Sequence, residues 1–224
     1  TNMDGLRGVA VSGSYAYVVG YNSDSLAVVD VSTPSAPALV GSLIDSTNMD
    51  KANGVAVSGS YAYVVGFNSD SLAVVDVSTP SAPALVGSLI DSTNMDGANR
   101  VAVSGSYAYV TARSSDSLAV VDVSTPSAPS LVGSLIDSTN MDAAYGVAVS
   151  GSYAYVVGGS SDSLAVVDVS TPSAPSLVGS LIDSTNMDDA RGVAVSGSYA
   201  YVAGYNSDSL AVVDVSTPSA PSLV

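Results

Sequence analysis

The chain has 224 residues, and 47% of them are hydrophobic, which is enough to bury a core and argues against disorder. It contains no cysteine and no histidine, which excludes disulfides, zinc sites built on these residues and a histidine general base. The formal net charge is −15, so nucleic acid is not an expected partner. No apolar run has the length of a membrane span and no leader resembles a signal peptide, so we expect no membrane insertion.

A unit of 46 residues repeats along the chain, and each copy opens with Thr-Asn-Met-Asp. A fixed period of this length is typical of solenoids and propellers. We therefore predict one domain over residues 1–224, with each copy forming one structural unit. The copies span residues 1–46, 47–92, 93–138, 139–184 and 185–224, and the last one lacks the six residues that end the others.

Each copy contains four strand-like segments and no window with the 3.6-residue period of a helix. Gly13-Ser14 gives a two-residue hairpin signal between the first two segments. The two prolines within residues 32–37 exclude a central strand there. In the first copy the predicted strands are, in chain order, Val9–Ser12, Tyr15–Val19, Leu26–Val31 and Leu39–Ile44.

Continuous apolar runs such as Leu26–Val31 indicate strands that are covered on both faces of the sheet. Sheets of this kind need a neighbour on each side, and radial stacking supplies one. We therefore predict an all-β fold, a five-bladed β-propeller with four antiparallel strands per 46-residue blade. The first strand of each blade is expected to line the channel of a closed ring. An open solenoid of blades is the alternative.

Residues 26–32 read Leu-Ala-Val-Val-Asp-Val-Ser, and Pro34 and Pro37 follow. This segment resembles the LVIVD repeat of bacterial and archaeal surface proteins. Gly8-Val9-Ala10-Val11 with Tyr15-Ala16-Tyr17-Val18 is similar to the inner strands of NHL-type propeller blades. The resemblance implies a propeller that is exported or displayed at the cell surface. It implies no established activity and supplies no catalytic residues.

Nine of the 46 positions differ between copies, and eight of these fall in two short windows. Successive connections of an antiparallel meander alternate between the two ends of the sheet, so both windows map to one end of the blades. The windows contain all five basic residues and every aromatic residue outside the repeated tyrosine pair. The first window covers residues 5–8, 51–54, 97–100, 143–146 and 189–192, and the second covers residues 19–22, 65–68, 111–114, 157–160 and 203–206.

Arginine and aromatic side chains dominate binding hot spots, so the variable end is the predicted binding surface. We expect non-enzymatic recognition of a glycan or a protein by a monomer, without a cofactor or a metal. The alternative is a structural or engineered symmetric scaffold without a specific ligand, because loops also drift neutrally. The candidate ligand-binding residues are Leu6, Arg7, Tyr21, Asn22, Lys51, Asn53, Phe67, Asn68, Asn99, Arg100, Arg113, Tyr145, Asp189, Arg191, Tyr205 and Asn206.

Other repeated polar residues have structural interpretations. Residues 45–50 are rich in oxygen ligands of the kind that calcium prefers, but their spacing fits Asx turns better. Asp24 and its copies are too regular for one active site, and Asp30 is expected to cap a turn. Tyr15 and Tyr17 share one side of their strand, so we expect them to pack between blades.

Overall fold

The computed structural model describes residues 2–224, and within them the chain forms strands, turns and no helix. No described segment is therefore a helix that could cross a membrane. The strands are β1 Leu6–Ser12, β2 Tyr15–Gly20, β3 Ser25–Asp30, β4 Ala38–Ile44, β5 Ala52–Ser58, β6 Tyr61–Gly66, β7 Ser71–Asp76, β8 Ala84–Ile90, β9 Ala98–Ser104, β10 Tyr107–Ala112, β11 Ser117–Asp122, β12 Ser130–Ile136, β13 Ala144–Ser150, β14 Tyr153–Gly158, β15 Ser163–Asp168, β16 Ser176–Ile182, β17 Ala190–Ser196, β18 Tyr199–Gly204, β19 Ser209–Asp214 and β20 Ser222–Leu223.

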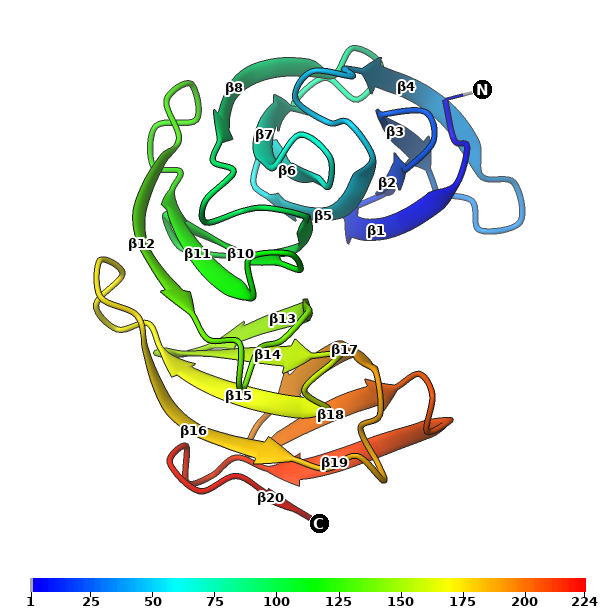
Figure 1. Ribbon diagram of the computed structural model, residues 1–224. Coiled ribbons are helices and arrows are strands. Elements are labelled where there is room, and N and C mark those ends of the chain that lie inside the picture. The colour runs from blue at the N-terminus through cyan, green and yellow to red at the C-terminus, as the bar shows by residue number, and fades with distance from the viewer. Residues whose placement is uncertain (1) are drawn as a thin grey trace.

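Each repeat folds into one four-stranded antiparallel meander, so the prediction of five blades is confirmed. The first strand of each blade lies innermost and the fourth lies outermost (Figure 1). The innermost strands β1, β5, β9, β13 and β17 pack side by side in chain order. In the last blade, β20 has only two residues because the chain ends there.

The hairpin between β1 and β2 has Gly13 at φ 57°, the left-handed conformation that a Gly-X turn requires. The start of β1 differs from the prediction, because this strand begins at Leu6 rather than at Val9. The antiparallel pairing of β1 with β2 has a register shift between Leu6 and Gly8. Beyond this shift the pairing continues, and Leu6 pairs with Gly20. The first variable window therefore lies largely within the innermost strands and not in a loop before them.

Apolar cores fill the space between successive blades. Between the second and third blades, Tyr63, Val65 and Leu72 come from one side, and Met95 and Ala98 come from the other. The equivalent residues form the same core at the other three junctions, except that Thr111 stands in place of the valine between the third and fourth blades. The prediction that both tyrosines of each pair pack between blades is confirmed at these junctions. The second tyrosine, such as Tyr63, belongs to the core, and the first, such as Tyr61, is partly buried against it.

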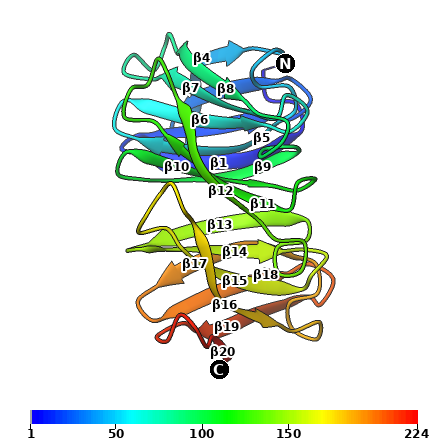
Figure 2. The same ribbon diagram turned by 60° about the vertical axis from the view of Figure 1, so that its left-hand side comes forward.

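The five blades form an open arc, which differs from the predicted closed ring. Within the described residues, β17 and β1 do not pack together as neighbouring innermost strands do. Figure 1 shows the first and last sheets apart, and Figure 2 shows the sheets stacked in chain order from the N-terminus to the C-terminus. Leu210 in the last blade is 66% exposed, whereas its equivalent Leu118 is fully buried. Near-identical blades do not specify how many neighbours complete a ring, so the repeat sequence alone could not decide closure.

The repeated aspartates have structural roles. Asp45 accepts hydrogen bonds from the backbone N–H groups of Thr47 (2.9 Å) and Asn48 (3.0 Å) and from the Asn48 amide (2.9 Å), which is an Asx turn. Asp24 accepts from the N–H of Lys51 (2.9 Å) and so joins the first blade to the second. Asp30 accepts from the N–H of Ser32 (2.8 Å), as expected for a turn cap.

Met95 and Met3 are equivalent residues in different surroundings, so comparing their substitutions measures how much an interblade core contributes to the free energy of unfolding. Met95 is fully buried, whereas Met3 is 39% exposed because no other blade of this structure packs against that side of the first blade. Met95→Ala should lower stability by about 2–5 kcal/mol through lost contacts and a cavity. Met3→Ala should lower it by less than about 1 kcal/mol, in line with other exposed substitutions. Urea denaturation followed by tyrosine fluorescence measures both, and equal effects would contradict the assignment of Met95 to a core.

The Asx turns predict a loss of stability in acid. Burial raises the pKa of Asp91, but the hydrogen bonds from Asn94 and Thr93 outweigh it, so this pKa lies below its usual value. The pKa values of Asp45, Asp137 and Asp183 are lowered by equivalent bonds. A lowered folded-state pKa stabilises the fold above the unfolded value of about 3.9, and this contribution is lost as the pH falls through the folded value.

We therefore expect the thermal midpoint to fall between pH 7 and about pH 3. A variant with Asn at all four positions should lose less over the same range, because asparagine keeps an acceptor oxygen but does not titrate. Circular dichroism melts at several pH values test this. An unchanged pH dependence in the variant would show that these carboxylates do not control acid stability.

Candidate ligand-binding site

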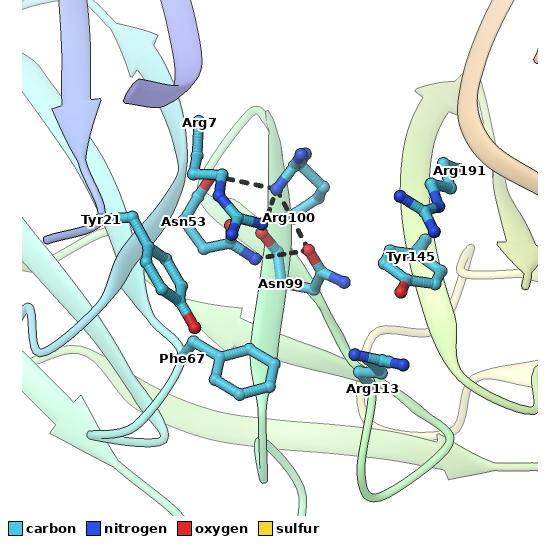
Figure 3. A pocket seen from close by; sticks show the side chains of 9 residues that line it. All are labelled: Arg7, Tyr21, Asn53, Phe67, Asn99, Arg100, Arg113, Tyr145 and Arg191. Carbon is cyan, nitrogen blue, oxygen red and sulfur yellow. Dashed lines mark hydrogen bonds between the residues drawn. The ribbon is translucent and has the colours of Figure 1, made fainter. Parts of the chain in front are cut away.

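A hollow of about 200 Å³ lies where the innermost strands begin, at the variable end of the blades. Nine of the predicted residues line it, and they come from all five blades (Figure 3). The lining is formed by arginine, asparagine and aromatic side chains, and no described aspartate belongs to it. The lining residues are Arg7, Tyr21, Asn53, Phe67, Asn99, Arg100, Arg113, Tyr145 and Arg191.

A polar network forms the floor of this hollow. The amide of Asn53 donates to Asn99 Oδ1 (2.6 Å), and Arg100 Nη1 donates to Asn53 O (2.9 Å), Asn99 O (3.0 Å) and Asn99 Oδ1 (3.1 Å). Asn53 is 5% exposed, and its Oδ1 has no hydrogen-bond partner within the described residues. An unpaired buried acceptor costs about 1–3 kcal/mol, so this oxygen offers a place for a donor on a ligand.

Arg100 stands where the other copies have glycine. At those glycines the inner strands approach closely, and a Cβ at Gly54 would lie 2.8 Å from Asn99 O. The third blade carries a second departure, Thr111 in place of an aliphatic residue. The Thr111 hydroxyl donates to Tyr145 O (2.6 Å), and the Arg100 N–H donates to Thr111 Oγ1 (3.3 Å). The Thr111 hydroxyl therefore joins the main chains of Arg100 and Tyr145 and links the third blade to the fourth.

Two basic side chains lie over an aromatic ring of the hollow, Arg7 from within the lining and Lys51 from outside it. Tyr21 and Phe67 lie with ring centroids 6.4 Å apart and tilted by 53°. The Arg7 guanidinium lies 4.3 Å from the Tyr21 centroid, and Lys51 Nζ lies 5.1 Å from it. Cation–π contacts of this kind hold a basic side chain in place without neutralising its charge.

A second hollow of about 340 Å³ adjoins the first and shares Arg113, Tyr145 and Arg191 with it. Arg113 lies 5.2 Å from the Tyr145 ring centroid. Arg191 forms an ion pair with Asp189 (2.6 Å) and lies 3.7 Å from the Tyr205 ring. The second hollow therefore has mixed charge, whereas the first is lined by cations alone among its charged residues.

Positive charge is concentrated at the first hollow although the whole chain is acidic. Four of the five basic residues line it, and the ion pair of Arg191 is the one salt bridge among residues 2–224. Burial lowers the pKa of Arg100, and the nearby charge of Arg7 lowers it further, although Tyr145 acts in the opposite direction. Arg100 is therefore a cation whose charged form is disfavoured mainly by burial, whereas the hydrogen bond from Arg191 to Asp189 raises the pKa of Arg191.

The remaining predicted residues lie around the hollows. Asp189 and Asn206 line the second one, together with Gly159, Ser160, Asp162 and Asp188, which the sequence analysis did not select. Lys51 and Tyr205 contact lining residues through the cation–π contacts described above. Asn22 and Asn68 are exposed in the adjacent loops. Leu6 lies elsewhere, in an apolar surface with Val9 and Val18 on the side of the first blade that faces away from the second blade.

Comparison with solved structures supports the fold. A protein from Lactobacillus plantarum superposes with a TM-score of 0.85 at 19% identity, over 98% of this chain and 70% of that one. The periplasmic gluconolactonase PpgL of Pseudomonas aeruginosa superposes with a TM-score of 0.78 at 19% identity, over 95% and 66%. The computationally designed protein Ika8 superposes with a TM-score of 0.62 at 10% identity, over 97% and 73%. At these identities the likeness concerns the fold alone.

No curated protein matches the sequence. The LVIVD repeat family matches it five times, at residues 6–45, 50–91, 97–137, 143–183 and 188–224. Each match covers nearly all of one blade, and together they span most of the chain. The chain therefore belongs to the LVIVD repeat family.

Proposed function

We propose that the protein is a non-enzymatic binding protein that recognises an acidic saccharide at the first hollow. The observation that carries this proposal is the convergence of Arg7, Arg100, Arg113 and Arg191 on one hollow that has no carboxylate in its described lining. Arginine guanidinium groups pair with carboxylates and sulfates through two parallel hydrogen bonds. An anionic group is the ligand that would relieve the repulsion between these cations.

The guanidinium of Arg100 supports the same conclusion. One of its nitrogens is occupied by the asparagine floor, and its other N–H groups make no hydrogen bond to the described residues. Arg113 makes no ion pair within residues 2–224 and touches Tyr145 only through its ring. Both side chains therefore keep donors available for a ligand.

The neutral groups of the hollow favour a saccharide over a simple anion. Asn53 Oδ1 has no hydrogen-bond partner within the described residues, and a sugar hydroxyl can donate to an amide oxygen of this kind. The tilted rings of Tyr21 and Phe67 present apolar faces for the C–H face of a sugar. A hollow of about 200 Å³ is smaller than pockets for drug-sized ligands, so it suits one acidic sugar unit. The adjoining hollow would then take the next unit.

The chemistry of the first hollow favours binding over catalysis. The sequence contains no histidine and no cysteine, and no described carboxylate lines the hollow. General acid–base catalysis needs a group that titrates near the working pH, and glycosidases need a pair of carboxylates. The likeness to the gluconolactonase of P. aeruginosa concerns the fold, and function resides in sites that vary on one fold.

Isothermal titration with a short uronic-acid oligosaccharide tests this proposal. The parent protein should bind the oligosaccharide, bind its carboxyl-reduced form much more weakly, and lose affinity as sodium chloride is added. Arg113→Ala should lower affinity by about tenfold or more, because a hydrogen bond to a charged group contributes about 1.5–3 kcal/mol. Arg113→Lys should recover part of the loss, since it keeps the charge but not the planar fork.

Lys51→Ala is the matched control, because it removes the same charge at the same end of the blades from a residue outside the lining. It should change affinity little. Equal losses in the Lys51 and Arg113 variants would indicate a general charge effect and contradict a specific site. Binding of acidic peptides but no saccharide would point to a protein ligand instead. Absence of binding to either would favour a structural scaffold.

A further inference from the structure

The two ends of the arc carry unpartnered halves of the interblade core. On the first blade, Met3, Leu6, Val9 and Val11 are 39–66% exposed. Their equivalents on the third blade are fully or largely buried against the preceding blade. We call this surface of the first blade the leading face.

The last blade carries the opposite half. Leu210 is 66% exposed and Ala203 is also exposed, while Tyr201 and Val212 are half-buried. Their equivalents on the second blade belong to a core and are at most 5% exposed. We call this surface of the last blade the trailing face. At each of the four internal junctions, a trailing face packs against a leading face.

Backbone contacts confirm that a neighbour is missing at the trailing face. A Cβ at Gly8, Gly54 or Gly146 would lie 2.8–3.0 Å from a carbonyl oxygen of the next blade. At Gly192, in the last blade, the nearest atom is Ala203 Cβ of the same blade, at 3.8 Å. The last blade therefore keeps this glycine although no neighbouring backbone lies close to it in this arc.

We propose that the two faces mediate head-to-tail association, in which the trailing face of one copy of this chain packs on the leading face of a second copy. The junction would repeat the four internal ones, since both surfaces carry the residues that form those cores. The faces differ from each other, so the contact is heterologous rather than two-fold symmetric. The expectation of a monomer depended on a closed ring, which the arc does not form.

Three local differences separate the proposed junction from the internal ones. Ala203 replaces the fully buried valine of the first, second and fourth blades, as at Val65, so the trailing face has a smaller side chain there. Leu6 replaces the alanine that is fully buried at every internal junction, as at Ala98. The short β20 leaves part of β19 without an outer partner, since only Val213 and Asp214 are paired. Association should therefore be weaker than the cohesion of internal blades. It does not depend on the proposed ligand, because neither face forms the floor of the first hollow.

Analytical ultracentrifugation of the 224-residue protein over a wide concentration series tests the proposal. The parent should form dimers and larger species as the concentration rises. Val9→Asp places a charge on the leading face, and Leu210→Asp places one on the trailing face. Each variant alone should sediment as a monomer, because a buried unpaired carboxylate opposes the apolar contact.

A mixture of the two variants should form a one-to-one dimer and nothing larger. The Val9 variant keeps an intact trailing face, and the Leu210 variant keeps an intact leading face, so one productive contact remains. Ile90→Asp is the matched control, because Ile90 is 54% exposed on the outermost strand β8, away from both faces. This control should associate like the parent. Leu6→Ala should associate at least as tightly, since it restores the internal sequence.

A parent protein that remains monomeric at every concentration would overturn the proposal. It would indicate that the arc closes or that the leading and trailing faces stay exposed to solvent. Dimers of the Leu210 variant alone, or no dimer in the mixture, would overturn the head-to-tail contact. Loss of association in the Ile90 control would show that any added charge disrupts assembly. Circular dichroism of each variant confirms that it remains folded.

Discussion

The contact between neighbouring blades is the interaction on which the rest of this structure depends. Each blade is a sheet with apolar residues on both faces, so a single blade exposes more apolar surface than it can cover by itself. Met95 and Leu118 become fully buried only because another blade lies against them. Stability in such an array is approximately a sum of the blades and their junctions, which explains why most core positions are identical in every copy.

Because the structure depends on the contacts between blades, the residues at one end of the blades are free to vary. The inner strands must approach closely at their glycines, and the turns need their own residues, but the side chains at the mouth of the channel contact little of the core. Thr111 shows how a departure is accommodated, since its hydroxyl forms hydrogen bonds with main-chain groups of Arg100 and Tyr145. Variation at this end changes the chemistry of the hollow. It reaches the interblade cores at two positions, where Thr111 replaces the valine found at Val65 and Leu6 replaces the alanine found at Ala98.

The charged residues are divided in the same way, with repeated aspartates in the turns and basic residues at the variable end. Aspartates recur in every blade because Asx turns and caps need a side-chain acceptor oxygen, which aspartate supplies, and they give the protein its charge of −15. Asp45 and Asp24 are engaged by backbone N–H groups, so they are structural elements of the connections. The few cations sit apart from these carboxylates, and a local positive site on an acidic protein is the result.

The sequence by itself determined the blade: the 46-residue period, four antiparallel strands and the location of both variable windows at one end. These follow from local rules, such as the hairpin at Gly13 and the apolar runs. Three features depended on the tertiary structure. The start of β1 at Leu6 results from a register shift that pairs Leu6 with Gly20. The network of Asn53, Asn99 and Arg100 joins neighbouring blades, and no spacing within one repeat encodes it. The open arc arises because the angle between blades is a property of their packing, whereas a repeated sequence specifies only that each face has a neighbour.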